Sequence, residues 1–137
     1  MRNDAEAVVE GFYAAWRLQD IDATLGYCAY DFHYTVHQPE GVKGLGGHMV
    51  GKAAVRPYLV AVCGIWEFIY LAPVSLSVNG NKVRGLTRFH SVHRRTGLPL
   101  TGTKRHVWQV ENGLITSVEE YHDAGQIKAF LAMADAQ

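Results

Sequence analysis

Hydrophobic residues recur every three to four positions in four segments of the chain, and this spacing predicts helices. The four helices are expected over residues 5–18, 20–28, 52–66 and 123–133. Asp4 stands just before the first segment, and Asp20 and Asp123 begin the second and the fourth, where an N-cap is expected. Alternation of hydrophobic and polar residues predicts strands over residues 31–37, 66–78, 83–94, 100–110 and 114–122. A glycine-rich loop is expected over residues 41–51.

The order is helix, helix, strand, helix and then four strands in a meander, which predicts an α+β fold in a single domain, residues 1–137. We expect one bent, mainly antiparallel sheet, forming a cone-shaped barrel around the three helices of the N-terminal half. The short fourth helix would close the C-terminal end. Three helices are too few to fill the concave face, so a cavity for a ligand is expected there.

The last two strands meet at Glu111-Asn-Gly and carry two titratable side chains, His106 and Glu120. With a three-residue turn, His106 lies opposite Val118 and Glu120 is its diagonal neighbour, roughly 7–8 Å away along the backbone. With a two-residue Asn-Gly turn the register slips by one residue, and Glu119 takes the place of Glu120. The three-residue turn is preferred because it gathers hydrophobic residues on the face of the pair. A carboxylate and an imidazole on a hydrophobic wall are typical of general acid–base chemistry.

A neighbouring strand supplies two further candidates, Arg88 and His90. If the preceding turn is centred near Gly97, Arg88 falls opposite His106, and both candidates share the face of Glu120. A salt-bridge ladder on the sheet surface is the alternative. Candidate substrate contacts from hydrophobic positions are Tyr34, Trp108, Trp16, Tyr13 and Val118. These five residues also suit a hydrophobic core, and that alternative stays open.

Charge and composition argue against several other functions. Thirteen basic residues balance thirteen acidic ones, so no overall field attracts nucleic acid or an anionic membrane. No hydrophobic stretch reaches the length of a membrane span. Seven histidines lack the spacing of a zinc site, so no metal and no cofactor is expected. The polar N-terminus and two cysteines, interpreted as free thiols, favour a cytoplasmic protein.

Several segments resemble one known superfamily. Val8-Val9 and Asp20-Ile-Asp near the start, and Val110-Glu-Asn-Gly-Leu-Ile and Glu119-Glu-Tyr-His-Asp near the end, are similar to the nuclear transport factor 2-like superfamily, and within it to SnoaL-like domains. The resemblance implies the cone fold described above. It also implies a homodimer formed through the outer face of the sheet.

The enzyme branches of this superfamily suggest roles for individual residues. SnoaL-type polyketide cyclases pair a histidine or aspartate with an acidic general base fourteen residues later, and His106 and Glu120 match that spacing, with glutamate for the usual aspartate. Limonene-epoxide hydrolases use an Arg-x-Asp pair, and Arg88-Phe-His90 occupies that place with histidine for aspartate. Ketosteroid isomerases match less well, because Phe12 stands at the position of their oxyanion tyrosine.

These observations lead to a cofactor-independent enzyme, an isomerase, cyclase or hydrolase, that acts on a small, largely apolar organic molecule. Glu120 would be the general base, with its pKa raised by burial. His106 would orient Glu120 or act as the general acid, and Arg88 or His90 would stabilise a developing negative charge. The alternative is a non-catalytic ligand-binding or dimeric interaction module with the same fold.

Overall fold

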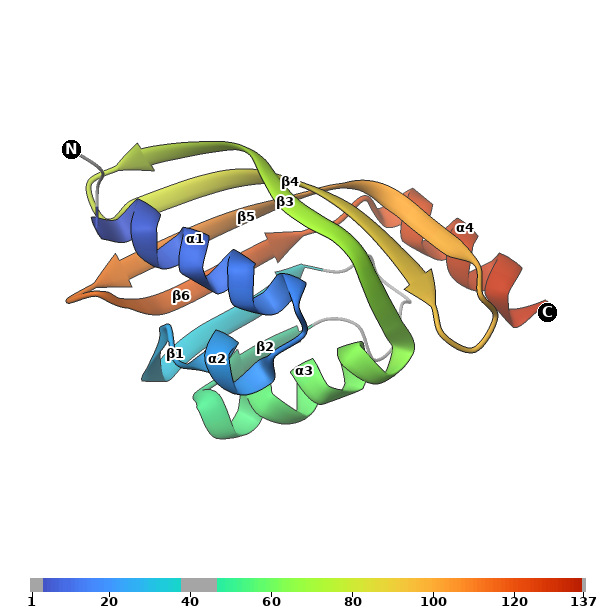
Figure 1. Ribbon diagram of the computed structural model, residues 1–137, viewed down its shortest axis with the longest axis horizontal. Coiled ribbons are helices and arrows are strands. Elements are labelled where there is room, and N and C mark those ends of the chain that lie inside the picture. The colour runs from blue at the N-terminus through green and yellow to red at the C-terminus, as the bar shows by residue number, and fades with distance from the viewer. Residues whose placement is uncertain (1–3, 38–46, 137) are drawn as a thin grey trace.

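One open, six-stranded mixed sheet curves around the helices (Figure 1). The computed structural model describes residues 4–37 and 47–136. The helices are α1 (Asp4–Arg17), α2 (Ile21–Leu25), α3 (Lys52–Ile65) and α4 (Ala124–Asp135). The strands are β1 (Cys28–His37), β2 (Gly47–Val50), β3 (Trp66–Asn79), β4 (Lys82–His93), β5 (Pro99–Glu111) and β6 (Leu114–Tyr121). The order across the sheet is β2-β1-β6-β5-β4-β3, and only β1 and β6 run parallel.

The predicted α+β class is confirmed, and so are the expected helices, with shifts of a few residues at their ends. Asp20 caps α2 by accepting a hydrogen bond from the backbone of Ala23, and Asp123 caps α4 by accepting one from Gln126. The sheet is bent but does not close into a barrel, because β2 and β3 remain edge strands. None of the helices in the described residues is long and hydrophobic enough to cross a membrane.

The expected loop over residues 41–51 is wrong in its second part. Gly47–Val50 forms the edge strand β2, which pairs antiparallel with β1. Residues 41–46 lie outside the described part of the chain. The sequence did not predict this strand, because four residues, one of them glycine, are too few to show a clear alternation of hydrophobic and polar positions.

The hairpin of β5 and β6 differs from both registers that the sequence allowed. Asn112 and Gly113 form a two-residue turn with positive φ angles of 52° and 78°. A bulge then leaves Thr116 without a partner across the strands, and this extra residue offsets the one-residue slip of the short turn. His106 therefore lies directly opposite Glu120, not diagonal to it.

The hairpin of β4 and β5 overturns the prediction for Arg88 and His90. Its four-residue loop is closed by a hydrogen bond from the His93 backbone N–H to the Leu98 carbonyl. As a result Gly85, not Arg88, lies opposite His106, a difference of three residues. Because an odd shift exchanges the two faces of a strand, Arg88 and His90 lie on the outer face.

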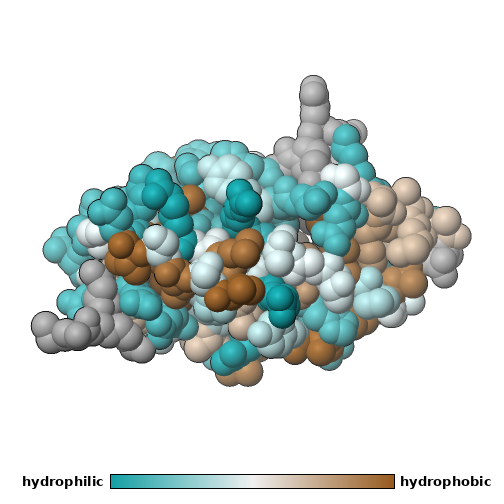
Figure 2. Space-filling view, turned by 90° about the horizontal axis from the view of Figure 1, so that it is seen from above, coloured by the Kyte–Doolittle hydropathy of each residue, from teal (hydrophilic) through white to brown (hydrophobic). Residues whose placement is uncertain are grey.

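The hydrophobic core lies between α1 and the concave face of the sheet. Phe12 and Tyr13 of α1 pack edge-on against Trp108 of β5, with ring centroids 4.8 and 5.4 Å apart. Seen from above, hydrophilic residues cover most of the body of the molecule, whereas the end formed by α4 is more hydrophobic (Figure 2). On that end, Ile127 and Phe130 turn inward and Met133 is exposed.

Substitution of two aromatic residues of β1 would test how the sheet packs on this core. Phe32 is 1% exposed and Tyr30 is 81% exposed, because the pairing of β1 is irregular between Cys28 and His33. Phe32→Ala should lower the free energy of unfolding by about 3–5 kcal/mol, since it leaves a cavity in the core. Tyr30→Ala is the control and should change it by less than about 0.5 kcal/mol. Urea unfolding of both variants measures the difference; equal effects would contradict the packing described here.

Candidate active site

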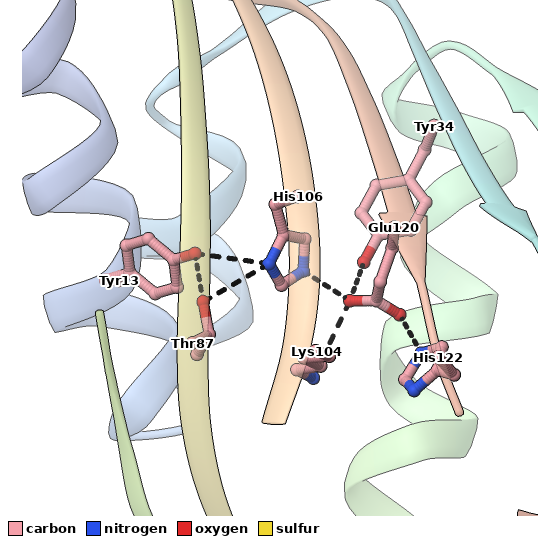
Figure 3. Close-up of polar contacts among 7 residues, drawn as sticks. All are labelled: Tyr13, Tyr34, Thr87, Lys104, His106, Glu120 and His122. Carbon is pink, nitrogen blue, oxygen red and sulfur yellow. Dashed lines mark hydrogen bonds and ion pairs between the residues drawn. The ribbon is translucent and has the colours of Figure 1, made fainter. Parts of the chain in front are cut away.

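A buried carboxylate, that of Glu120 on β6, is the centre of the site (Figure 3). Glu120 is 4% exposed. Its Oε1 lies 2.7 Å from Nε2 of His106, and its Oε2 lies 2.6 Å from Nε2 of His122. An ionised carboxylate only accepts hydrogen bonds, so both imidazoles donate to it.

Two further groups complete the surroundings of this carboxylate. The hydroxyl of Tyr34 on β1 donates to Oε1 at 3.3 Å, and Nζ of Lys104 on β5 lies 3.6 Å from the same oxygen. Figure 3 shows these four partners around Glu120, with Tyr34 on β1, Lys104 and His106 on β5, and His122 just after the end of β6. Polar groups of the protein thus replace the water that a buried carboxylate loses.

The pKa of Glu120 is shifted in the direction opposite to the sequence prediction. Burial alone would raise the pKa, as expected, but the charges of Lys104 and His122 and the hydrogen bonds from His106 and His122 outweigh it. The pKa of Glu120 is therefore held well below its ordinary value. The side chain is ionised at neutral pH and is a weak base by itself.

His106 is neutral and its orientation is fixed. Burial lowers its pKa, although the hydrogen bond to Glu120 acts in the other direction. Because Nε2 carries the hydrogen given to Glu120, Nδ1 of the neutral ring is an acceptor. The hydroxyl of Tyr13 donates to Nδ1 at 3.1 Å, and the hydroxyl of Thr87, hydrogen-bonded to Tyr13, lies 3.4 Å from the same atom. Burial raises the pKa of Tyr13, so it stays a neutral donor.

Gly85 makes room for this contact. It lies opposite His106 on β4, and a Cβ placed there would stand 3.4 Å from the hydroxyl of Tyr13 and 3.0 Å from Cδ2 of Leu76. A larger side chain would have to displace one of them. The small residue therefore lets α1 bring Tyr13 close to the sheet.

Glu120 lies on the wall of a largely aromatic pocket. The empty volume is about 720 Å³, including the part that is open to solvent. An ammonium, a carboxylate and an imidazole line it, namely those of Lys104, Glu120 and His122, and Ser91 adds a hydroxyl. The rest of the lining is aromatic or aliphatic: Trp16, Tyr34, Tyr58, Val62, Trp66, Phe68, Phe89, Leu100, Ile127, Phe130 and Leu131. Such a composition suits a small, largely apolar ligand with one polar end.

The structure brings together only some of the residues selected from the sequence. His106 and Glu120 are in contact, and Trp16 and Tyr34 line the pocket. Tyr13, Trp108 and Val118, expected to contact substrate, lie elsewhere. All three are buried in the core near His106 and are not part of the pocket lining.

Arg88 and His90 are the clearest errors. They line a shallow hollow on the outer face of the sheet, together with Tyr70 and Thr103, on the side away from Glu120. The groups that sequence reasoning missed are Lys104 and His122. Their signal was present, because each is two residues from a predicted site residue and so shares its face of the strand.

No group of three or more histidine, cysteine, aspartate or glutamate side chains in residues 4–37 and 47–136 is arranged to hold a metal ion. The site just described contains one carboxylate and two imidazoles, and Lys104 occupies a further side of the carboxylate. The polar groups of the pocket therefore suit proton transfer and the binding of a negatively charged oxygen.

The two buried titratable groups predict that acid destabilises the fold. His106 has a lower pKa in the folded protein, so only the unfolded chain takes up its proton as the pH falls below 6.5, and stability is lost there. Glu120 also has a lowered pKa, so its contribution is present above 4.5 and is lost as the pH falls through its folded value.

Urea unfolding between pH about 7 and pH about 5 measures the first effect, which amounts to at most about 1.4 kcal/mol per pH unit for one proton. His106→Gln should reduce this slope. His90→Gln, which changes an imidazole on the outer face, should keep it. An unfolding free energy that is equal at both ends of the range would contradict a neutral, buried His106.

Solved structures with the same fold are numerous. The crystal structure of TerC, co-crystallised with polyporic acid, is 24% identical with a TM-score of 0.82, and the match covers 95% of this chain and 97% of that one. A protein from Bacillus subtilis, provisionally named an isomerase, is 18% identical with a TM-score of 0.81, covering 94% and 93%. A protein from Xanthomonas campestris pv. campestris, provisionally named a polyketide cyclase, is 20% identical with a TM-score of 0.76, covering 94% and 95%.

At these identities the likeness shows the fold alone. Another neighbour, from Catenulispora acidiphila, is described as having a ketosteroid isomerase-like fold. No curated protein matches the chain in sequence. Residues 9–118, most of the chain, match the SnoaL-like domain family, and the chain therefore belongs to that family.

Proposed function

We propose that the protein is a cofactor-independent acid–base enzyme. Its substrate would be a small, largely apolar organic molecule with a carbonyl or enol oxygen. The observation that carries the proposal is the position of Glu120, Lys104 and His122 together on the wall of a pocket that is otherwise mostly aromatic and aliphatic. Charged groups that share such a hydrophobic wall are expensive to bury, and a function accounts for that cost.

In this proposal His122 exchanges the proton with substrate, and Glu120 supports it. The short contact between Glu120 Oε2 and His122 Nε2 orients the ring and stabilises the imidazolium that forms. In Figure 3 the second ring nitrogen of His122 points away from Glu120. When the ring is neutral, this nitrogen would remove a proton from the carbon next to the substrate carbonyl. The C–H electron pair then forms a carbon–carbon double bond, and the π pair of the carbonyl moves to the oxygen to give an enolate.

Lys104 would hold that oxygen. Its Nζ is 3.6 Å from Glu120 Oε1, longer than a hydrogen bond, and 5.5 Å from the centre of the Phe89 ring. The ammonium group therefore has donor capacity left for an enolate, which carries the negative charge during the reaction. Return of the proton to another carbon gives isomerisation, and attack of the enolate carbon on a second carbonyl gives cyclisation.

His106 and Tyr13 would be positioning residues. They form a hydrogen-bonded series from α1 through β5 to Glu120, and neither lines the pocket. By donating to Oε1, His106 leaves Oε2 for His122. The arrangement assigns one carboxylate oxygen to the interior and the other to the catalytic imidazole.

The names of related proteins support this class of reaction. Two structural neighbours carry the provisional names isomerase and polyketide cyclase, and both reactions include proton transfer next to a carbonyl. The crystal of TerC contains polyporic acid. These names belong to those proteins and serve here only to select compounds for the first experiment.

The test uses exchange of carbon-bound hydrogen for deuterium, followed by proton NMR in D₂O on tetralones and indanones. The wild-type protein should accelerate loss of the signal next to the carbonyl. Glu120→Gln should reduce this rate by about 10²-fold or more, because the imidazolium loses its counter-charge. Glu119→Gln makes the same chemical change one residue away on the outer face and should keep the wild-type rate. Lys104→Met should also lower the rate by about 10²-fold, through loss of the enolate contact.

Binding is measured in parallel, through quenching of the fluorescence of Trp16 and Trp66 in the pocket. Compounds that bind without accelerated exchange in the wild-type protein would contradict catalysis and support a ligand-binding role. Equal rates for wild type and Glu120→Gln would remove Glu120 from the mechanism. The variants should retain the wild-type circular dichroism spectrum, so that a loss of rate is not a loss of fold.

The homodimer implied by the family resemblance is proposed to form through the outer face of the sheet. The shallow hollow of Tyr70, Arg88, His90 and Thr103 lies on that face and gives it a polar, uncovered centre. Light scattering of the purified protein should then give twice the chain mass of 15.2 kDa. Arg88→Glu should lower that mass; a monomeric wild-type protein would contradict the proposal.

A further inference from the structure

Two imidazoles lie together on the outer face of the sheet, at the edge opposite to β3. His33 of β1 stands between the buried residues Phe32 and Tyr34, so it points away from the pocket. His48 of β2 is its diagonal neighbour across the antiparallel pair. Both side chains are exposed, and Nδ1 of His33 lies 3.2 Å from Nε2 of His48.

This separation suits a shared metal ion. Histidine nitrogens bind zinc at about 2.05 Å, so two of them lie about 3.4 Å apart at a tetrahedral angle and about 2.9 Å apart at a right angle. The observed 3.2 Å falls between these limits. The two nitrogens therefore already stand at the separation that a shared ion requires, and the rings would turn so that both lone pairs meet at the ion.

Thr35 fixes the form of His48 that can bind. Its hydroxyl oxygen lies 2.7 Å from Nδ1 of His48. When Nδ1 carries the hydrogen and Thr35 accepts it, Nε2 keeps a free electron pair directed at His33. This is the usual second contact of a metal-binding histidine, which gives its other N–H to an oxygen. On binding, the hydrogen of His33 moves from Nδ1 to its exposed Nε2, so no net loss of a proton is required.

We propose that His33 and His48 bind a divalent late first-row transition metal ion, such as Zn²⁺, Ni²⁺ or Cu²⁺, as a two-imidazole chelate. Imidazole nitrogen is a preferred ligand of these ions. The described residues contain no group of three metal-binding side chains, so water completes the coordination. The site would therefore be open and exchangeable, which distinguishes it from a closed structural zinc site.

Such an ion would link β2 to β1. β2 has only four residues, and α3, which begins two residues after it, contributes Tyr58 and Val62 to the pocket. A metal bound across the two strands would hold this edge of the sheet and the start of α3 in place. Metal binding should therefore raise the temperature of unfolding by selective binding to the folded state.

The experiment is calorimetric titration of the tag-free protein with ZnCl₂ in a buffer that does not bind metal. Wild type should bind one Zn²⁺ per chain. His33→Ala and His48→Ala should each weaken binding by about tenfold or more, because the chelate becomes a single ligand. Thr35→Val should weaken it by about tenfold, through loss of the outer contact. His37→Ala removes an exposed imidazole of the same strand face and should leave the affinity unchanged.

Electron paramagnetic resonance of the Cu²⁺ form gives a second measurement, with coupling to two imidazole nitrogens in wild type and one in His33→Ala. The proposal is overturned if the double variant His33→Ala/His48→Ala binds Zn²⁺ as tightly as wild type. It is also overturned if His37→Ala loses as much affinity as His48→Ala. In either case the contact between the two rings is a hydrogen bond only.

Discussion

The solvation of one buried carboxylate organises this protein. Glu120 lies where water is largely excluded, and its charge persists because two imidazoles, a phenol and an ammonium group take the place of water. These four donors come from β1, from β5 and from the residue that follows β6, so the charge is stable only when the three strands are correctly paired. The same contacts tie α1 to the sheet, since Tyr13 hydrogen-bonds to His106. Fold and candidate chemistry therefore depend on one network.

The same contacts explain why burial does not raise the pKa of Glu120. A carboxyl group in a hydrophobic pocket ordinarily becomes a stronger base, which was the expectation from the sequence. In this protein the neighbouring cation and imidazoles reverse the sign, so the carboxylate stays ionised and a neighbouring ring is better suited to move the proton. Chemical roles thus depend on partners that a list of residue types does not specify.

The sequence predicted the helices, most strands and the inward position of His106 and Glu120, because hydrophobic periodicity and aspartate N-caps are local signals. It failed for Arg88 and His90, because their side of the sheet depends on the length of the loop around Arg95. Adjacent loop lengths exchange the faces of a strand, and residues 94–97 allow more than one turn. A cavity was expected from the sequence, but most of its lining was not, since Phe89 and Phe130 meet there only through tertiary packing.

The unpaired Thr116 also limits how the sequence of β6 can change during evolution. Glu119 and Glu120 are adjacent, so one of them points inward in either of two registers of the hairpin that differ by one residue. If the bulge were lost, β6 would shift by one residue against β5, and Glu119 would point inward in place of Glu120. Tyr121 would then replace His122 beside that acid, and Ser117 would replace Val118 in the core. His122 and Val118 therefore favour the observed register. An insertion of an odd number of residues near this turn would change the inward face of β6, whereas an even number would keep it.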